Sequence, residues 1–320
     1  MKYSIIVPVY NRPDEVDELL ESLSSQTLRD FEVVIVEDGS QIPCKDVCDK
    51  YANILDLHYY FKENSGPGQS RNYGVERANG EYVIIVDSDA GTPPGFMQAV
   101  DDELKRQPSD AWGGPDAAHE SFTDIQKAIS YAMTSFFTTG GIRGGKKQLD
   151  KFYPRSFNLG VRREVYQALG GFSPLRFSKM SLYGEDIDFS IRIYKGGYSC
   201  RLFPEAWLWH KRRTDFRRFW RQVYNSGIAR VNLWRKYPEA LKPVHALPSV
   251  FTIGVAGLLL LAPFTHGLSL LPLLLYILLI FIDSSIRNRS VKVGLISIPA
   301  VFVQLIGYGI GFIESLFRKV

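Results

Sequence analysis

The stretch from Tyr82 to Ala90 constrains the fold more than any other part of the sequence. It opens with a run of apolar, mostly β-branched residues and ends in Asp87, Ser88 and Asp89. A continuous apolar run of this kind indicates a central strand that is covered on both faces. The two carboxylates then lie at the carboxyl end of the strand, where open α/β sheets bind ligands, and they offer the oxygen donors that Mg²⁺ or Mn²⁺ prefers. The same residues are also typical of a solvated turn, since Gly-Thr-Pro-Pro follows them.

Strand and helix patterns alternate along the N-terminal part of the chain. Strands are predicted at residues 4–9, 31–36, 57–61 and 82–86, with helical patterns between them. Alternation with short connections predicts an α/β fold, a mostly parallel sheet with helices on both faces. A further strand is expected at residues 155–158. Cys44 and Cys48 share one helical stripe with Val47 and Tyr51, which indicates core packing rather than half of a zinc site.

Two further residues in this region are candidates for nucleotide binding. Asp38 follows the second strand, so it could accept a hydrogen bond from a nucleobase or a ribose, although an ordinary Asp-Gly turn is the alternative. Arg71 lies in the first turn of the helix that follows Gly66, where it could reach a phosphate as a charge-assisted donor. The glycines at residues 140–145 suit a lid or a merely slack loop.

A second group of carboxylates occurs at Glu185 and Asp186. The apolar spacing of Ile187 and Ile191 predicts a helix whose first turn holds both acids, directly after Gly184. Carboxylates are favoured at a helix N-terminus by the helix dipole without any catalytic role. A carboxylate fixed there is also a rigidly aimed base, able to accept a proton at neutral pH.

Six motifs, in order along the chain, together resemble those of the family 2 glycosyltransferases, inverting enzymes of the GT-A fold. The motifs are residues 4–12, residues 36–40, Arg71-Asn72 with Gly74, Asp87-Ser88-Asp89, Gly170-Gly171-Phe172 and Glu185-Asp186-Ile187-Asp188. The resemblance covers residues 3–215 and implies a nucleotide-sugar-binding GT-A domain with a Rossmann-like mixed sheet at residues 1–213.

The resemblance implies which residues bind the nucleotide. Pro8, Tyr10 and Arg12 would line the nucleotide pocket. Asp38 would hold the base, and Asp87 would contact the ribose or the metal. The implied donor is a nucleotide-diphosphate sugar, with a UDP-sugar favoured.

The resemblance also implies a metal and a base. Asp89 and Asp87 would ligate Mg²⁺ or Mn²⁺, and His210 is a further candidate ligand or phosphate contact, or else faces solvent. Asp186, next to Glu185, would be the general base that deprotonates the acceptor hydroxyl.

The C-terminal part of the chain is apolar, and a basic segment precedes it. Between Arg201 and His245 the sequence holds eleven Lys or Arg and three acids. Residues 214–245 combine these charges with aromatic residues, so they are expected to lie at a membrane interface or to pack as a helix on a domain. Residues 246–320 form the predicted transmembrane region, and its apolar segments are residues 247–264, 268–282 and 293–312.

The charges around these segments predict their topology. The link between the first two carries no Lys or Arg, whereas Arg287, Arg289 and Lys292 follow the second, so both ends of a hairpin are expected on the cytoplasmic side. A third span would place Arg318 and Lys319 on the opposite side, which leaves a re-entrant or interfacial helix as the alternative. The third segment also has GxxxG spacing, a signal for close helix contact, at Gly307 and Gly311.

These features predict an enzyme that moves a sugar to a lipid-linked, polyprenyl-type acceptor in the membrane and has no nucleic-acid partner. No signal-peptide pattern precedes the first strand, and three cysteines suit a reducing compartment, so the catalytic domain is expected on the cytoplasmic side of a bacterial inner membrane. The alternatives are a membrane-anchored sugar-nucleotide-binding module without turnover and a nucleotidyltransferase. The latter is disfavoured because no basic glycine loop opens the chain.

Overall fold

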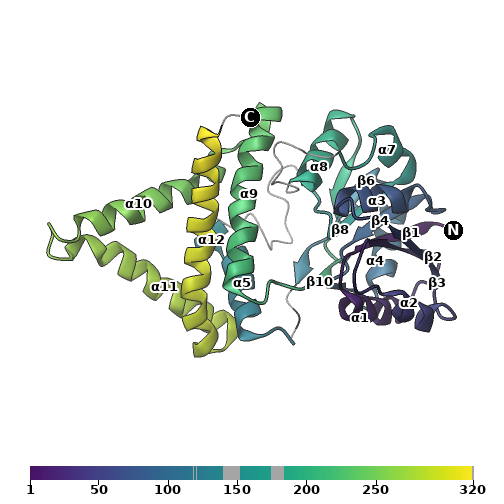
Figure 1. The fold of residues 1–320 in the computed structure, drawn as a ribbon, viewed down its shortest axis with the longest axis horizontal. Coiled ribbons are helices and arrows are strands. Elements are labelled where there is room, and N and C mark those ends of the chain that lie inside the picture. Colours follow the sequence, from purple (N-terminus) through teal and green to yellow (C-terminus); the bar gives the residue numbers. More distant parts are fainter. Residues whose placement is uncertain (118, 120, 140–151, 174–183, 319–320) are drawn as a thin grey trace. The chain divides into compact units, whose positions relative to one another are not determined.

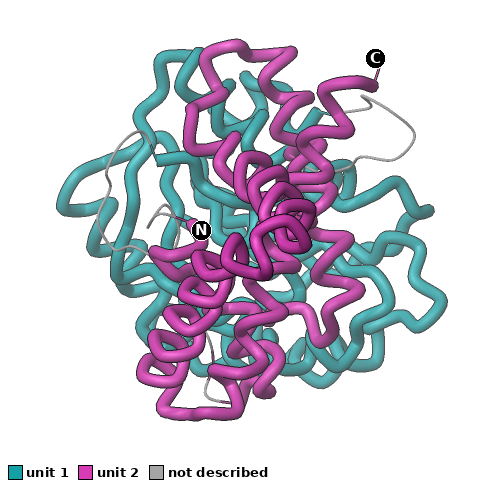
Figure 2. Tube along the Cα trace, turned by 90° about the vertical axis from the view of Figure 1, so that its left-hand side faces the viewer, with its two compact units in different colours: residues 1–117, 145–175, 185–210 teal, residues 118–144, 176–184, 211–320 magenta. Residues whose placement is uncertain are grey.

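The structure, a computed structural model, describes residues 1–117, 119, 121–139, 152–173 and 184–318. It divides into two compact units, which Figure 2 distinguishes by colour. The first comprises residues 1–117, 145–175 and 185–210, and the second comprises residues 118–144, 176–184 and 211–320. The glycine-rich loop predicted at residues 140–147 lies outside the described residues.

A seven-stranded sheet forms the centre of the first unit (Figure 1), with the strand order β3-β2-β1-β4-β8-β6-β9. Its strands are β1 (Tyr3–Val9), β2 (Phe31–Asp38), β3 (Asp56–Lys62), β4 (Tyr82–Val86), β6 (Ala111–Gly113), β8 (Asn158–Arg162) and β9 (Cys200–Leu202). The first four strands of the chain run parallel, whereas β8 is antiparallel to both of its neighbours. The prediction of a mixed α/β sheet is confirmed.

Helices cover both faces of this sheet, which explains why β4 is apolar and buried at every position. One face packs against α1 (Pro13–Ser24), α2 (Lys45–Tyr51) and α4 (Phe96–Arg106). The other face packs against α3 (Pro67–Val75), α7 (Arg163–Ala168) and α8 (Glu185–Lys195). Cys44 and Cys48 are buried in the first of these cores, so the prediction that they pack in the core is confirmed.

The strand expected at residues 155–158 is wrong in its position. The strand β8 begins at Asn158 and continues to Arg162, while the amide N–H of Asn158 donates to the carbonyl of Arg155 at 3.0 Å and closes a turn. Leu159 and Val161 are the buried apolar residues of the strand. The sequence pattern at residues 155–158 did not indicate that the strand continues through them.

A small second sheet positions one of the predicted site residues. Its strands, in the order β5-β10-β7, are β5 (Ala90–Gly91), β10 (Leu208–His210) and β7 (Asp116–Ala117). The antiparallel pairing of β10 with β5 sets His210 opposite Ala90. His210 is thereby brought next to the carboxylates that follow β4.

The second unit is helical. Its α-helices are α5 (Asp124–Thr134), α6 (Phe136–Thr139), α9 (Phe216–Lys236), α10 (Leu247–Leu261), α11 (Leu271–Asn288) and α12 (Val291–Phe317), and its 3₁₀ turns are η1 (Pro238–Ala240), η2 (Pro243–Ala246) and η3 (Leu268–Leu270). Within the described residues, three helical segments are long and apolar enough to cross a membrane: Pro243–Leu261, Leu268–Asn288 and Val291–Phe317. The three predicted apolar segments therefore fall largely on helices. The first helix ends at Leu261, before the predicted end at residue 264, whereas the second and third are longer than predicted.

Candidate active site

Three side chains that can ligate a metal meet at the carboxyl end of β4. The Nε2 atom of His210 lies 3.2 Å from Oδ1 of Asp89 and 3.9 Å from Oδ2 of Asp87. The candidate ligand atoms of these three residues all lie within 4.8 Å of one another. Carboxylate oxygens suit Mg²⁺ or Mn²⁺, and the imidazole adds a nitrogen donor. The donor set therefore fits a divalent cation, and the structure brings together all three residues predicted for one.

The surroundings of Asp89 keep it ionised. Its carboxylate is buried, with Oδ2 2.5 Å from Nη1 of Arg12. Burial alone would raise the pKa of Asp89, but the adjacent His210 and Arg12 outweigh it and hold the pKa well below the usual range. The ring of Phe157 stacks on His210 with 4.8 Å between centroids and restricts the imidazole. Asp89 is thus a negatively charged oxygen donor at neutral pH.

Arg71 connects the end of β4 to the start of α8. Its guanidinium is buried, with Nη2 2.9 Å from Oδ1 of Asp87 and Nη1 2.5 Å from Oε1 of Glu185. The ring of Phe172 lies beside it, 5.1 Å from the guanidinium carbon. Two of its donor nitrogens are therefore engaged by carboxylates, and the phosphate contact stays a prediction.

Glu185 is the buried member of the pair at the start of α8. A Cβ atom on Gly68 would meet its carboxylate, so a larger residue at that position of α3 would displace the Glu185 side chain. Burial, and to a smaller extent the neighbouring Asp186, raise the pKa of Glu185, whereas Arg71 lowers it. The net result is a pKa of about 7. Glu185 therefore holds a proton more readily than an ordinary glutamate.

Asp186 is the more open member of the pair. Its side chain is 19% exposed, compared with 11% for Glu185. One oxygen accepts from the amide N–H of Ile187 at 2.9 Å, and the other lies 3.4 Å from Nη1 of Arg155. Both acids occupy the first turn of α8, as the sequence predicts, and the helix dipole stabilises a charge there.

Asp38 lies at the end of β2 and holds the loop that leads into α3. One carboxylate oxygen accepts from the amide of Ser65 and from Lys62, and the other accepts from the amide of Gly66, with both amide bonds at 2.9 Å. Asp38 is buried by these contacts. Its contact with a nucleobase is not tested by this geometry and stays a prediction.

Pro8 and Tyr10 lie at the end of β1, between the ends of β2 and β4 in the sheet order. Pro8 is partly buried, whereas Tyr10 is 49% exposed and presents its ring at this edge. The residues predicted for nucleotide binding thus share one edge of the sheet.

Some residues that shape this edge lie in the motifs at residues 4–12 and 36–40, but the sequence assigned them no role of their own. Glu37 is fully buried and accepts from the Ser40 hydroxyl and from the amide of Cys44. Ser40 in turn accepts from the amide of Asn11 at 2.7 Å, which ties β1 to β2. Asn11 has a φ of +54°, a conformation that asparagine adopts more readily than most residues, and this preference was the available signal. Asn72 was singled out only as part of a motif. Its side chain binds both the N–H and the carbonyl of Phe172.

Comparisons with known proteins identify the family of the chain. The model of the family described as "Glycosyl transferase family 2" matches residues 4–170. An uncharacterized glycosyltransferase of Rickettsia felis is 38% identical over 137 residues, which cover 43% of this chain and 22% of that protein. The poly(ribitol-phosphate) beta-N-acetylglucosaminyltransferase TarS of Staphylococcus aureus is 43% identical over 93 residues, covering 28% of this chain and 16% of TarS. The chain thus spans less than a quarter of the length of either relative.

A solved structure extends the likeness over the whole chain. The mannosyltransferase PcManGT from Pyrobaculum calidifontis, in complex with GDP-Man and Mn²⁺, superposes with a TM-score of 0.65 at 19% identity and covers 100% of this chain and 88% of its own. At this identity the likeness concerns the fold. Because the family match includes more than half of the chain, the protein belongs to glycosyl transferase family 2.

Proposed function

We propose that this protein transfers a sugar, with inversion, from a nucleotide-diphosphate sugar to a hydroxyl-bearing, lipid-linked acceptor at a membrane. The observation that carries the proposal is the ion-paired connection from Asp87 through Arg71 to Glu185, because it fixes the cation site relative to the helix that bears Asp186. A transferase of this kind needs a cation site for the leaving group and a base for the nucleophile at one edge of the sheet.

Asp186 is the general base of the proposed reaction. It takes the proton from the acceptor hydroxyl as that oxygen attacks the anomeric carbon from the face opposite the diphosphate. The bond from the anomeric carbon to the diphosphate oxygen breaks, and the configuration inverts. Glu185 is less suited to this task, because its carboxylate is buried and already paired with the guanidinium of Arg71.

Asp87, Asp89 and His210 would hold a divalent cation. Such a cation, when bound, supplies Lewis-acid neutralisation of charge on the diphosphate. Asp89 is ionised by its surroundings, which suits it to this role. Arg12, which pairs with Asp89 in the structure, is positioned to meet a donor phosphate in place of that carboxylate.

The membrane helices support an acceptor that resides in the bilayer. The proposed organisation is a catalytic domain at residues 1–213, an interfacial segment at 214–245 and a membrane region at 246–320. We propose that the catalytic domain lies on the cytoplasmic side of a bacterial inner membrane, where nucleotide sugars are available.

Transfer by the purified full chain tests the proposal. The protein is reconstituted in vesicles containing a polyprenyl phosphate or a lipid-linked saccharide and incubated with radiolabelled UDP-, GDP- or dTDP-sugars, with Mn²⁺, with Mg²⁺ or with EDTA. We expect label to enter the lipid fraction with one nucleotide class and only with a divalent cation. Donor binding without transfer or hydrolysis would indicate a binding module, and release of free pyrophosphate would indicate nucleotidyl transfer.

A further inference from the structure

The three long apolar helices of the second unit differ in how they are packed. In the first two helical segments, Pro243–Leu261 and Leu268–Asn288, only 11% of the most apolar 18-residue stretch is buried. The corresponding share is 44% in Val291–Phe317. The helices α10 and α11 expose large apolar side chains such as Leu260 (73%) and Leu275 (67%). They form the hairpin that projects from the rest of this unit in Figure 1. This hairpin has the surface of a bilayer-inserted element, whereas α12 has extensive protein contacts.

The helix α12 packs against α5, α10 and α11 and most extensively against α9, and its contact with α9 is close enough to require glycine. A Cβ atom on Gly311 would run into the backbone carbonyl of Tyr224, and one on Gly227 would run into that of Tyr308. Figure 1 shows the two helices side by side. Near their carboxyl ends, Arg235 donates to the carbonyl of Ser315 at 2.8 Å. The helices therefore stay together over most of the length of α9 and share one depth relative to any membrane.

The surface of α9 is incompatible with the interior of a bilayer. Its exposed residues include Arg217, Arg218 and Arg221 in the first two turns. These turns lie beside the middle of α12, because a Cβ atom on Gly307 would meet Val223 and Trp220. If α12 crossed the membrane, the three arginines would be carried to the bilayer centre, where charged side chains are strongly disfavoured.

We propose that only the α10–α11 hairpin enters the bilayer, and that α12 lies at the membrane surface, paired with α9, whose arginines are at the level of the lipid headgroups. The charges agree with this arrangement. Arg287, Arg289, Lys292 and Arg318 then all remain on one side of the membrane, as the positive-inside tendency requires. The length and hydropathy of α12 alone would have predicted a span. The inference concerns attachment to lipid and does not depend on the proposed reaction.

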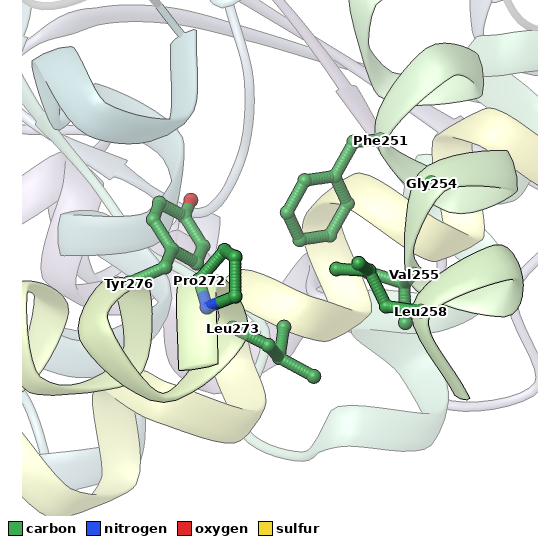
Figure 3. Close-up of a pocket in the computed structure, with 7 residues that line it drawn as sticks. All are labelled: Phe251, Gly254, Val255, Leu258, Pro272, Leu273 and Tyr276. Atoms are coloured by element: carbon green, nitrogen blue, oxygen red, sulfur yellow. The ribbon is translucent and has the colours of Figure 1, made fainter. Parts of the chain in front are cut away.

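The inside of the hairpin is also consistent with lipid. A cavity of about 190 Å³ lies between α10 and α11, and Figure 3 shows the side chains that line it. Its lining includes Phe251, Val255, Leu258, Leu273 and Tyr276, with few polar atoms. An apolar gap of this kind between exposed helices is readily filled by acyl chains. We therefore propose that the exposed apolar surface of the hairpin is covered by a lipid bilayer.

Spin-label depth measurements on the full chain test the inference. Cys44 and Cys48 are replaced by Ala and Cys200 by Ser, and single labels are placed in separate proteins at Ile253→Cys, Leu278→Cys, Arg221→Cys and Ile310→Cys. In vesicles, we expect the two hairpin labels to be accessible to oxygen and shielded from a water-soluble nickel reagent. The labels on α9 and α12 should both show headgroup depth. A label at Ile310 as deep as the one at Ile253 would overturn the inference.

A second measurement retains the native cysteines. A peptide tag is added after Val320, and protease is applied to sealed vesicles of known orientation. We expect the tag to be cleaved from the same side as the loops of the catalytic unit. Cleavage only from the opposite side would show that α12 crosses the membrane, whether or not the cysteine-free protein folds.

Discussion

Arg71 and Glu185 form a buried ion pair, with Nη1 of the arginine 2.5 Å from Oε1 of the glutamate. The two residues are 114 positions apart in the sequence. The same guanidinium binds Asp87, so one cation holds both the strand end with the carboxylates proposed to bind metal and the helix with the proposed base. The active-site edge is therefore stabilised by a long-range contact that several substitutions can probe.

Arg71→Met should destabilise the catalytic unit. The substitution leaves two carboxylates without their shared cation, and breaking a buried ion pair typically costs about 3–5 kcal/mol. We expect a lower melting temperature together with loss of transfer. Arg106→Met is the matched control, because the exposed Arg106 pairs with Glu103 within one helix and its loss should change the melting temperature little. Equal losses in the two variants would argue against a special role for Arg71.

Glu185 should make stability fall as the pH rises. Its pKa is about 7 in the folded protein and near 4.5 when unperturbed, so the folded state binds more protons than the unfolded state between these pH values. Stability is then highest at the acidic end and declines as the pH rises through this window. At 1.36 kcal/mol per pKa unit, the full effect is about 3 kcal/mol.

The comparison of wild type with Glu185→Gln isolates this effect. Glutamine does not titrate, so the difference in melting temperature, wild type minus variant, should become more negative from pH 5 to about pH 7 and then level off towards pH 8. A difference that stays constant over this range would show that Glu185 does not carry the raised pKa.

Much of this edge follows from local sequence, because the signals there are local. Apolar runs such as residues 82–86 identify strands buried on both faces, and the acids that end parallel strands must meet at one edge. The placement of Glu185 against Arg71 could not be predicted in this way, since nothing in either segment specifies its distant partner. The pairing of His210 with Ala90 involves strands of two and three residues, too short to recognise from periodicity.

The sequence did not decide whether α9 lies at a membrane surface or packs against another helix, and the reason is different. Aromatic and apolar residues on one face suit both a membrane surface and a helix interface, so composition does not separate the two. The structure shows contact with α12 through glycines, and Gly311, part of the GxxxG signal, is one of them. The GxxxG pattern indicated a close contact but not the partner.

Gly311→Ala should loosen the contact between α9 and α12. The added methyl group meets the backbone of Tyr224, which cannot move independently of its helix, and overpacking of this kind typically costs about 1–3 kcal/mol. The melting temperature in detergent should fall accordingly. Gly257→Ala in α10 is the control, because a Cβ atom there has no neighbour within 4 Å. A variant at Gly311 as stable as that control would contradict the packing described here.

Asp89→Ala should abolish cation-dependent donor binding while leaving the fold intact. Loss of residues that merely support metal ligands costs about 10–100-fold in affinity, so loss of a direct ligand should cost at least as much. Calorimetric titration of Mn²⁺ in the presence of a nucleotide sugar would measure the change. Asp49→Ala removes an exposed carboxylate that pairs only with Lys45 in the described contacts, and it should leave binding unchanged. An unaltered Mn²⁺ dependence in Asp89→Ala would remove this residue from the proposed site.

Asp186→Asn separates the two explanations of the acids that begin α8. If Asp186 only complements the helix dipole, the substitution should cost about 0.3–1 kcal/mol of stability and little activity. If it is the general base, the amide keeps the size of the side chain but cannot accept the proton, and the loss should be of the order of 10²–10⁴ in transfer rate. We expect the second result, with donor affinity and melting temperature close to wild type.

Glu185→Gln completes the test of the base. Because Glu185 is buried against Arg71, its substitution should alter stability and the pH profile more than it alters the proton transfer itself. Single-turnover transfer rates for the two variants, measured with saturating donor, compare the acids directly. If Asp186→Asn transfers sugar within a few-fold of wild type while Glu185→Gln is inactive yet folded, the base is Glu185. The open geometry of Asp186, with its side chain 19% exposed, would then have to serve acceptor binding instead.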